Sequence, residues 1–218
     1  DMSKLPVGIL ISGRGSNMAA LVEAAEAPDF PARIACVLAN RADAKGLEYA
    51  AARGIATALV DHKAFDGKPA FEAAMTAALE RNGVEFVCLA GFMRLLSPVF
   101  IDRWKDRLIN IHPSLLPSYK GLHTHERALA DGVKLAGCTV HFVRPEMDVG
   151  PIVAQAAVPV LSSDTPDSLA DRVLTAEHRL YPAVLKLIAG GKTRVVDERV
   201  DIDPSAVDTA ARLFSAGV

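Results

Sequence analysis

The sequence predicts a single α/β domain in which helices flank a doubly wound, mostly parallel sheet. Short apolar runs, the first of them at 5–11, alternate along the chain with stretches whose apolar residues recur at helical spacing. Such runs are typical of strands buried on both faces, and their alternation with helices is typical of a parallel sheet. The 218 residues, 50% of them hydrophobic, are enough for one domain with a substantial core.

The composition excludes several classes of function. The formal net charge is −2 and there is no basic run, so nothing indicates binding to nucleic acid or to an acidic membrane surface. No apolar stretch approaches the roughly 18 residues that a membrane span needs, and the first residues lack the pattern of a secretory signal. Cys36, Cys88 and Cys138 are odd in number and lie in apolar runs. We therefore expect a cytoplasmic protein with reduced core thiols.

A glycine-rich turn follows the first expected strand. The turn reads Ser-Gly-Arg-Gly-Ser-Asn at 12–17, and Met18, Leu21 and Val22 then recur at helical spacing. A strand, such a turn and a helix bring backbone N–H groups and the positive end of a helix to one place, which is a natural seat for phosphate. The turn lacks the third glycine of a dinucleotide fingerprint and the Gly-Lys-Ser/Thr of a P-loop. A monophosphate site and a structural tight turn both remain open.

The alternation continues to residue 90. We expect strands at 34–39, 56–60 and 86–90, and helices at 45–53 and from 66–69 to 82–83. Ser97 is then suited to cap a helix that has Pro98 at its first position and continues towards Trp104. The residues before it, Met93 to Leu96, form a mostly apolar loop. This loop would either wall a flat heteroaromatic ligand or be a buried connection.

The stretch 108–117 carries the strongest chemical signal. A short expected strand contains Asn110 and His112, and Pro113 and Pro117 constrain the loop that follows. Residues two apart share one face of a strand, so both side chains point the same way at the carboxyl end, where open α/β sheets keep their ligands. An amide beside an imidazole can stabilise an oxyanion and move a proton. The alternative is a histidine capped by loop carbonyls.

Two more histidines, His123 and His125, follow this loop at a spacing of two. Their nearness in sequence to His112 invites a metal site. No cluster of carboxylates or cysteines supports one, so we expect no metal.

Two acidic residues in the second half are candidates for the same site. We expect a short helix at 126–130, strands at 135–143 and 152–160, a long helix at 163–190, a strand at 193–196 and a short helix from Pro204. Asp148 lies in the loop between the two long strands. A carboxylate beside an imidazole orients the ring and favours its charged form, whereas most acidic loop residues are solvated. Glu177 falls on the apolar stripe of the long helix, so it forms a structural ion pair or belongs to the site.

Six segments give the chain its resemblance to a known family. They are Ile-Ser-Gly-Arg-Gly-Ser-Asn at 11–17, Leu-Ala-Gly-Phe-Met-Arg at 89–94, Asn-Ile-His-Pro-Ser-Leu-Leu-Pro at 110–117, Gly-Leu-His-Thr-His at 121–125, the Asp-x-Gly-Pro turn at 148–151 and Glu-His-Arg-Leu-Tyr-Pro at 177–182. In these segments the chain resembles the folate-dependent phosphoribosylglycinamide formyltransferases. The resemblance implies a Rossmann-related, formyltransferase-like domain over 2–218, with a nucleotide-binding half at about 2–97 and a folate-binding, catalytic half at about 98–218.

The resemblance also implies a role for each matching residue. The formyl group of the co-substrate 10-formyltetrahydrofolate would pass to the amine of glycinamide ribonucleotide, in a monomer or homodimer that holds no metal. The implied catalytic residues are Asn110, His112 and Asp148; the substrate-binding residues are Gly15, Ser16, Asn17 and Glu177; the folate-binding residues are Lys68, Met93, Arg94, Leu95, Leu96 and Asn110. Lys68 stands where the family often has arginine, and lysine lacks the planar fork that grips a carboxylate in two places.

Three other functions compete with this interpretation. Formyltetrahydrofolate deformylases use the same Asn110, His112 and Asp148 pattern but usually carry a preceding regulatory domain, whereas this chain begins directly at its first strand. Methionyl-tRNA formyltransferase would need a further domain and a basic face, which a net charge of −2 does not supply. A catalytically idle nucleotide-binding module would not be expected to keep all three residues.

Overall fold

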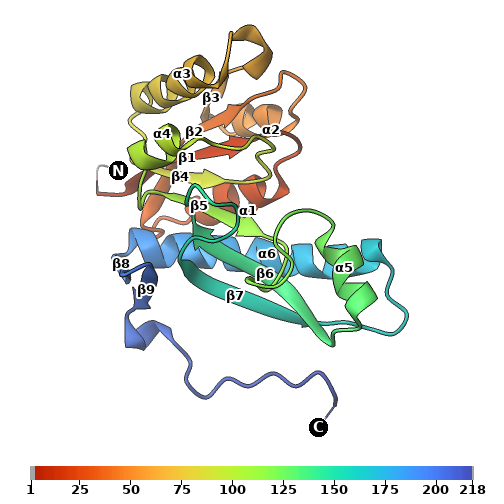
Figure 1. The fold of residues 1–218 in the computed structure, drawn as a ribbon. Coiled ribbons are helices and arrows are strands. Elements are labelled where there is room, and N and C mark those ends of the chain that lie inside the picture. Colours follow the sequence, from red (N-terminus) through yellow and green to blue (C-terminus); the bar gives the residue numbers. More distant parts are fainter. Residues whose placement is uncertain (1–2, 218) are drawn as a thin grey trace. The chain divides into compact units, whose positions relative to one another are not determined.

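The computed structural model describes residues 3–217, which form two compact units (Figure 1). Unit 1 comprises the chain up to Asn110 together with 142–145, and unit 2 comprises 111–141 and the chain from 146 onward. Strands β1 to β7 belong to one mostly parallel sheet, so the predicted fold class is confirmed.

Unit 1 alternates strands with helices, as the sequence predicts. Its strands are parallel and lie in the order β3-β2-β1-β4-β5. Its elements are β1 (Leu5–Ile11), α1 (Ser16–Ala25), β2 (Ala32–Ala39), α2 (Gly46–Ala52), β3 (Ala56–Leu59), the 3₁₀ turn η1 (His62–Ala64), α3 (Lys68–Arg81), β4 (Phe86–Leu89), α4 (Pro98–Arg103) and the first part of β5 (Leu108–His112).

The two faces of β1 pack against different helices, which makes the sheet doubly wound. Leu10 belongs to a buried cluster that includes Met75 and Leu79 of α3. Ile11 points to the opposite face, because side chains alternate along a strand. There it lies near Met18 of α1, as the crowding around Gly15 shows. The β1 run is apolar throughout because both of its faces are buried.

The strand order changes direction between β1 and β4. The chain passes from β1 outward through β2 to β3 and then returns to place β4 on the other side of β1. In open α/β sheets the crevice beyond the carboxyl ends of two such strands is where ligands bind. The glycine-rich turn follows β1 and the apolar loop follows β4, so both predicted binding segments of unit 1 begin at this switch point.

In unit 2, the long helix α6 lies along the antiparallel pair β6–β7 (Figure 1). The elements from residue 124 onward are α5 (Thr124–Asp131), β6 (Leu135–Phe142), β7 (Ile152–Pro159), α6 (Pro166–Ala189), β8 (Thr193–Val196), β9 (Arg199–Ile202) and the 3₁₀ turn η2 (Pro204–Ala206). Helix α6 begins with a capping box, in which the Thr165 side chain accepts from the Ser168 N–H and the Ser168 side chain accepts from the Thr165 N–H.

The sequence analysis missed β9, which pairs with β8 in a separate antiparallel sheet. The turn between them contains Asp197 and Glu198, with φ of 50° and 59°. Tight hairpin turns of this kind usually have asparagine or glycine at such positions, so the sequence lacks the usual hairpin signal.

The three cysteines are buried, as expected, and none of them forms a disulfide. Burial raises the pKa of Cys36 to about 11 and that of Cys138 to about 12, so both are thiols rather than thiolates at neutral pH. Among residues 3–217, no helix has the length and apolar character to cross a membrane.

Gly137 of β6 offers a direct test of the packing in unit 2. A Cβ at this position would overlap the carbonyl oxygen of Ala156 in β7 and lie 2.8 Å from Leu115 Cδ2. We expect Gly137→Ala to lower the free energy of unfolding by about 1–3 kcal/mol through overpacking. Gly13→Ala is the matched control, because a Cβ there meets no atom within 4 Å. Equal stability of the two variants in urea denaturation would contradict this packing.

Candidate functional site

His112 ends β5 and is held by a backbone carbonyl. His112 is 7% exposed, and its Nε2 lies 2.8 Å from the carbonyl oxygen of Tyr119. A carbonyl only accepts hydrogen bonds, so Nε2 carries the hydrogen and Nδ1 is the nitrogen whose protonation can change. The carbonyl cap that the sequence left as an alternative is therefore present. It fixes the ring and leaves Nδ1 for chemistry.

Asp148 faces that second nitrogen. Its Oδ2 lies 3.6 Å from His112 Nδ1 and accepts a hydrogen bond of 2.8 Å from the Gly121 N–H. The side chains of Asp148 and His112 are only 9% and 8% exposed. Asp148 is therefore not a solvated loop acid, and the predicted pairing of this carboxylate with His112 is confirmed. Its backbone has φ of 58°, an uncommon conformation for a residue other than glycine.

Ser114 supports the loop that carries the Tyr119 carbonyl. Ser114 is 3% exposed, and its hydroxyl oxygen lies 2.6 Å from the Ser118 carbonyl oxygen and 3.1 Å from the Tyr119 carbonyl oxygen. The carbonyl oxygen of Ser114 in turn accepts from Thr139 Oγ1 at 2.7 Å. With its hydroxyl directed at carbonyl groups, Ser114 stiffens the loop and is not placed as a nucleophile.

The other two histidines in this region are not arranged as metal ligands. His123 is exposed and its Nδ1 lies 3.5 Å from Glu126 Oε2. His125 is half-buried, and burial, followed by the nearby His112, lowers its pKa from 6.5. Within residues 3–217, no group of three histidine, cysteine or acidic side chains is arranged to hold a metal ion.

The glycine-rich turn has the geometry of a helix-end anion seat. Gly15 has φ of 70° and ψ of 47° and is the N-cap of α1, and Ser16 and Asn17 are the first residues of that helix. Gly46, which the sequence analysis missed, packs under the turn and donates from its N–H to the Gly13 carbonyl at 3.2 Å. A Cβ on Gly46 would lie 2.9 Å from Met18 Cε and 3.2 Å from the Arg14 carbonyl oxygen, so a larger residue here would require its neighbours to shift.

The loop after β4 is not a buried connection. Met93 is 72% exposed and Leu95 70% exposed, which contradicts that alternative and leaves an apolar surface open to a ligand. Lys68 is the exposed first residue of α3.

Asn110 and Glu177 are the remaining predicted site residues. Asn110 lies on β5 two residues before His112 and is the last residue of the first segment of unit 1. Glu177 of α6 is 7% exposed. Its charge adds to the effect of burial in raising the pKa of the Cys138 thiol, which places its carboxylate near Cys138.

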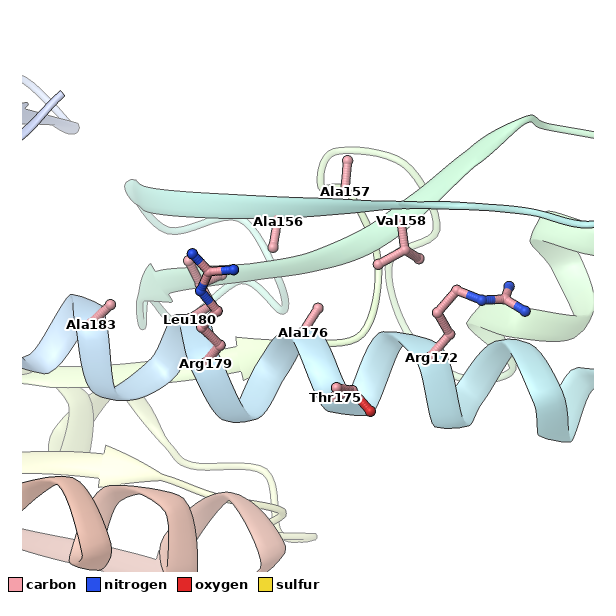
Figure 2. A pocket seen from close by; sticks show the side chains of 9 residues that line it. All are labelled: Ala156, Ala157, Val158, Arg172, Thr175, Ala176, Arg179, Leu180 and Ala183. Atoms are coloured by element: carbon pink, nitrogen blue, oxygen red, sulfur yellow. The ribbon is translucent and has the colours of Figure 1, made fainter. Parts of the chain in front are cut away.

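A separate cavity of about 610 Å³ lies between β7 and α6 (Figure 2). Ala156 and Val158 of β7 point towards the helix, and Arg172 and Arg179 extend from α6. Arg172 is already paired with Asp164 at 2.8 Å. None of the predicted site residues lines this cavity, so it is not the predicted site.

Comparison with known proteins identifies the family of this chain. Residues 6–185 match the family described as formyl transferase. The chain therefore belongs to the formyl transferase family. It is 43% identical over 195 residues to phosphoribosylglycinamide formyltransferase of Escherichia coli, which covers 89% of this chain and 92% of that protein.

Solved structures agree with this family assignment. Glycinamide ribonucleotide transformylase 1 from Symbiobacterium toebii matches with a TM-score of 0.89 and 44% identity over 93% of this chain and 95% of that one. Within the formyl transferases, the chain belongs to the phosphoribosylglycinamide formyltransferase family.

Two further matches set limits on this assignment. The chain is 46% identical to the trifunctional purine biosynthetic protein adenosine-3 of Gallus gallus over 88% of its own length but spans only 19% of that protein. Formyltetrahydrofolate deformylase from Burkholderia mallei matches with a TM-score of 0.83 and 30% identity over 91% of this chain and 70% of that one. The fold alone therefore does not separate formyl transfer from hydrolysis.

The lowered pKa of His125 predicts a pH dependence of stability. The folded protein binds this proton less readily than the unfolded chain, so the free energy of unfolding should decrease as pH falls below 6.5. We expect His125→Gln to lessen that decrease between pH 7.5 and pH 5.5 in urea denaturation. His123→Gln is the control, because its side chain is 68% exposed. An unchanged pH dependence in His125→Gln would contradict this account.

Proposed function

We propose that the protein transfers the formyl group of 10-formyltetrahydrofolate to the amine of glycinamide ribonucleotide, as a step of purine biosynthesis. The observation that carries the proposal is the restraint of His112 between the Tyr119 carbonyl and Asp148. The family assignment supports it, because the Escherichia coli and Symbiobacterium toebii relatives are named for this reaction.

The proposed mechanism is direct attack of the amine on the formyl carbon. The imidazolium of His112 and the amide of Asn110 stabilise the oxyanion that forms on the formyl oxygen. Asp148 Oδ2 lies 3.6 Å from Nδ1, where its negative charge balances that of the imidazolium during the attack. The attacking nitrogen loses a proton, and a proton passes through water to the departing folate nitrogen as the carbon–nitrogen bond to folate breaks. The formyl group moves directly, so no covalent enzyme intermediate forms.

The binding residues complete the proposal. Gly15, Ser16 and Asn17 hold the phosphate of the nucleotide at the start of α1, where backbone N–H groups and the helix dipole favour an anion. Glu177 receives the glycinamide end of the same substrate. The folate lies against Met93, Arg94, Leu95 and Leu96, with Lys68 near its acidic end.

A single assay separates this function from the deformylase alternative. The rate of tetrahydrofolate formation from 10-formyltetrahydrofolate is measured with and without glycinamide ribonucleotide. We expect product only when the nucleotide is present, and formylated nucleotide in equal amount. If tetrahydrofolate forms at the same rate with and without the nucleotide, the protein hydrolyses 10-formyltetrahydrofolate and the proposal is wrong.

The turn after β1 provides a test of phosphate binding. Gly15→Val places a side chain at the N-cap of α1, where φ is 70° and its Cβ would lie 3.0 Å from Met18 Cε, so the backbone that starts the helix must shift. We expect the KM for the nucleotide to rise about 10- to 100-fold through loss of hydrogen bonds to a charged group, with a much smaller effect on the KM for folate.

Gly13→Val is the control for this variant, because its Cβ would meet open space. Circular dichroism checks that both variants fold. An unchanged nucleotide KM in folded Gly15→Val would show that the phosphate does not bind at this turn.

His112 and Asp148 should behave as one unit in kinetics. We expect His112→Ala and Asp148→Asn each to lower kcat by about 10²- to 10⁴-fold, on the scale of lost acid–base groups. The double variant should lose little more than either single variant, because each change disables the same imidazolium. If the two losses in kcat multiply in the double variant, Asp148 acts independently of His112. Near-normal kcat in either single variant would exclude that residue from the mechanism.

A further inference from the structure

The loop between β4 and α4 is held at both of its ends by side chains from other elements of unit 1. Between the two anchors, Met93 and Leu95 are 72% and 70% exposed. A segment whose apolar side chains are this exposed gains little stability from burial. Its fixed conformation therefore depends on the hydrogen bonds at its two ends.

The first anchor joins this loop to the turn after β1. Met93 donates its N–H to Ser12 Oγ at 2.8 Å, and the Ser12 hydroxyl donates to Asn40 Oδ1 at 2.6 Å. Ser12 is 7% exposed and Asn40 1% exposed. A hydroxyl has one hydrogen, so its donation to Asn40 turns the oxygen lone pairs towards Met93. Asn40 thereby sets the direction of the bond that holds the loop.

The second anchor is a buried carboxylate on α3. Glu72 is 4% exposed and accepts from the Ser97 N–H at 2.8 Å and from the Ser97 hydroxyl. Ser97 is the N-cap of α4, as predicted, but its side chain makes no capping hydrogen bond. The hydroxyl is committed to Glu72 instead, which fixes the point where the loop enters α4.

The first anchor spans the topological switch point of the sheet. Ser12 follows the last residue of β1, Asn40 follows the last residue of β2, and the Met93 loop follows β4. Ser12 is also the first residue of the glycine-rich turn at 12–17. A displacement of that turn is therefore transmitted to Met93 through one hydrogen bond.

We propose that Ser12, Asn40 and Glu72 are positioning residues that preform the Met93–Leu96 wall for the flat ring system of the folate and couple its order to occupancy of the phosphate turn. The inference rests on the proposed function. None of the three residues touches the reacting atoms. Their effect is on the affinity for folate and on its dependence on the nucleotide, because a wall that is already ordered costs less to bind.

Steady-state kinetics with each substrate varied in turn test the positioning. We expect Ser12→Ala, Asn40→Leu and Glu72→Leu each to raise the KM for 10-formyltetrahydrofolate about 10-fold, since each removes one partner of an anchor hydrogen bond, while kcat changes by less than about 3-fold. Asn40→Asp keeps the acceptor oxygen and should retain most of the wild-type KM.

Thr76→Ala is the matched control. Thr76 Oγ1 accepts from Trp104 Nε1 at 3.3 Å, so this variant removes a hydroxyl hydrogen bond of unit 1 that does not involve the loop. Its folate KM should equal that of the wild type. Thermal unfolding of every variant separates loss of fold from loss of positioning. Folded anchor variants with an unchanged folate KM would overturn the proposal.

Equilibrium binding tests the coupling. We expect glycinamide ribonucleotide to tighten the Kd of tetrahydrofolate about 5-fold or more in the wild type, and to leave it nearly unchanged in Ser12→Ala. Because coupling is reciprocal, tetrahydrofolate must lower the Kd of the nucleotide by the same factor. An equal coupling factor in the two proteins would overturn the proposal. A wild type that forms no formylated nucleotide would instead refute the proposed function on which the inference rests.

Discussion

The chemistry proposed for this protein depends on one restraint, the fixing of the His112 imidazole from both sides. The Tyr119 carbonyl occupies one ring nitrogen and the Asp148 carboxylate faces the other. A histidine free to rotate would offer either nitrogen to solvent and would act as a general base of low specificity. With one nitrogen committed to a carbonyl, the ring has a single nitrogen for proton transfer.

This restraint requires an unusual backbone on both sides of the ring. Tyr119 and Asp148 both have positive φ, at 56° and 58°, although neither is glycine. Such conformations persist where the surroundings determine them. Here the Ser114 hydroxyl holds the loop of Tyr119, and the Gly121 N–H holds Asp148. The loop after β5 and the loop between β6 and β7 each present one oxygen atom to the same imidazole.

The sequence was sufficient for the fold class and for the pairing of His112 with Asp148, because these depend on local patterns and on a motif. Alternating apolar runs located all the strands of the main sheet within about three residues of their ends. The hairpin strand β9 was missed because its turn has Asp197 followed by Glu198, where an Asn-Gly or Asp-Gly pair would have marked the hairpin. The pattern of the chain carried no signal for that turn.

The supporting residues were missed for a different reason. Asn40, Gly46 and Glu72 act on segments far away in the sequence: Asn40 on Ser12, Gly46 on Gly13, and Glu72 on Ser97. No periodicity or spacing marks such a long-range contact. A mutational scan guided only by the motifs would therefore omit the residues that hold the motifs in place.

The most direct test of this account is ¹⁵N NMR of the histidine side chains, with the His112 signals assigned by their loss in His112→Gln. Two-bond correlations report which nitrogen of a neutral ring carries the hydrogen. The account predicts hydrogen on Nε2, directed at the Tyr119 carbonyl, with Nδ1 as the nitrogen that gains the proton. A neutral His112 ring with its hydrogen on Nδ1 would contradict the restraint from which the proposed mechanism is derived.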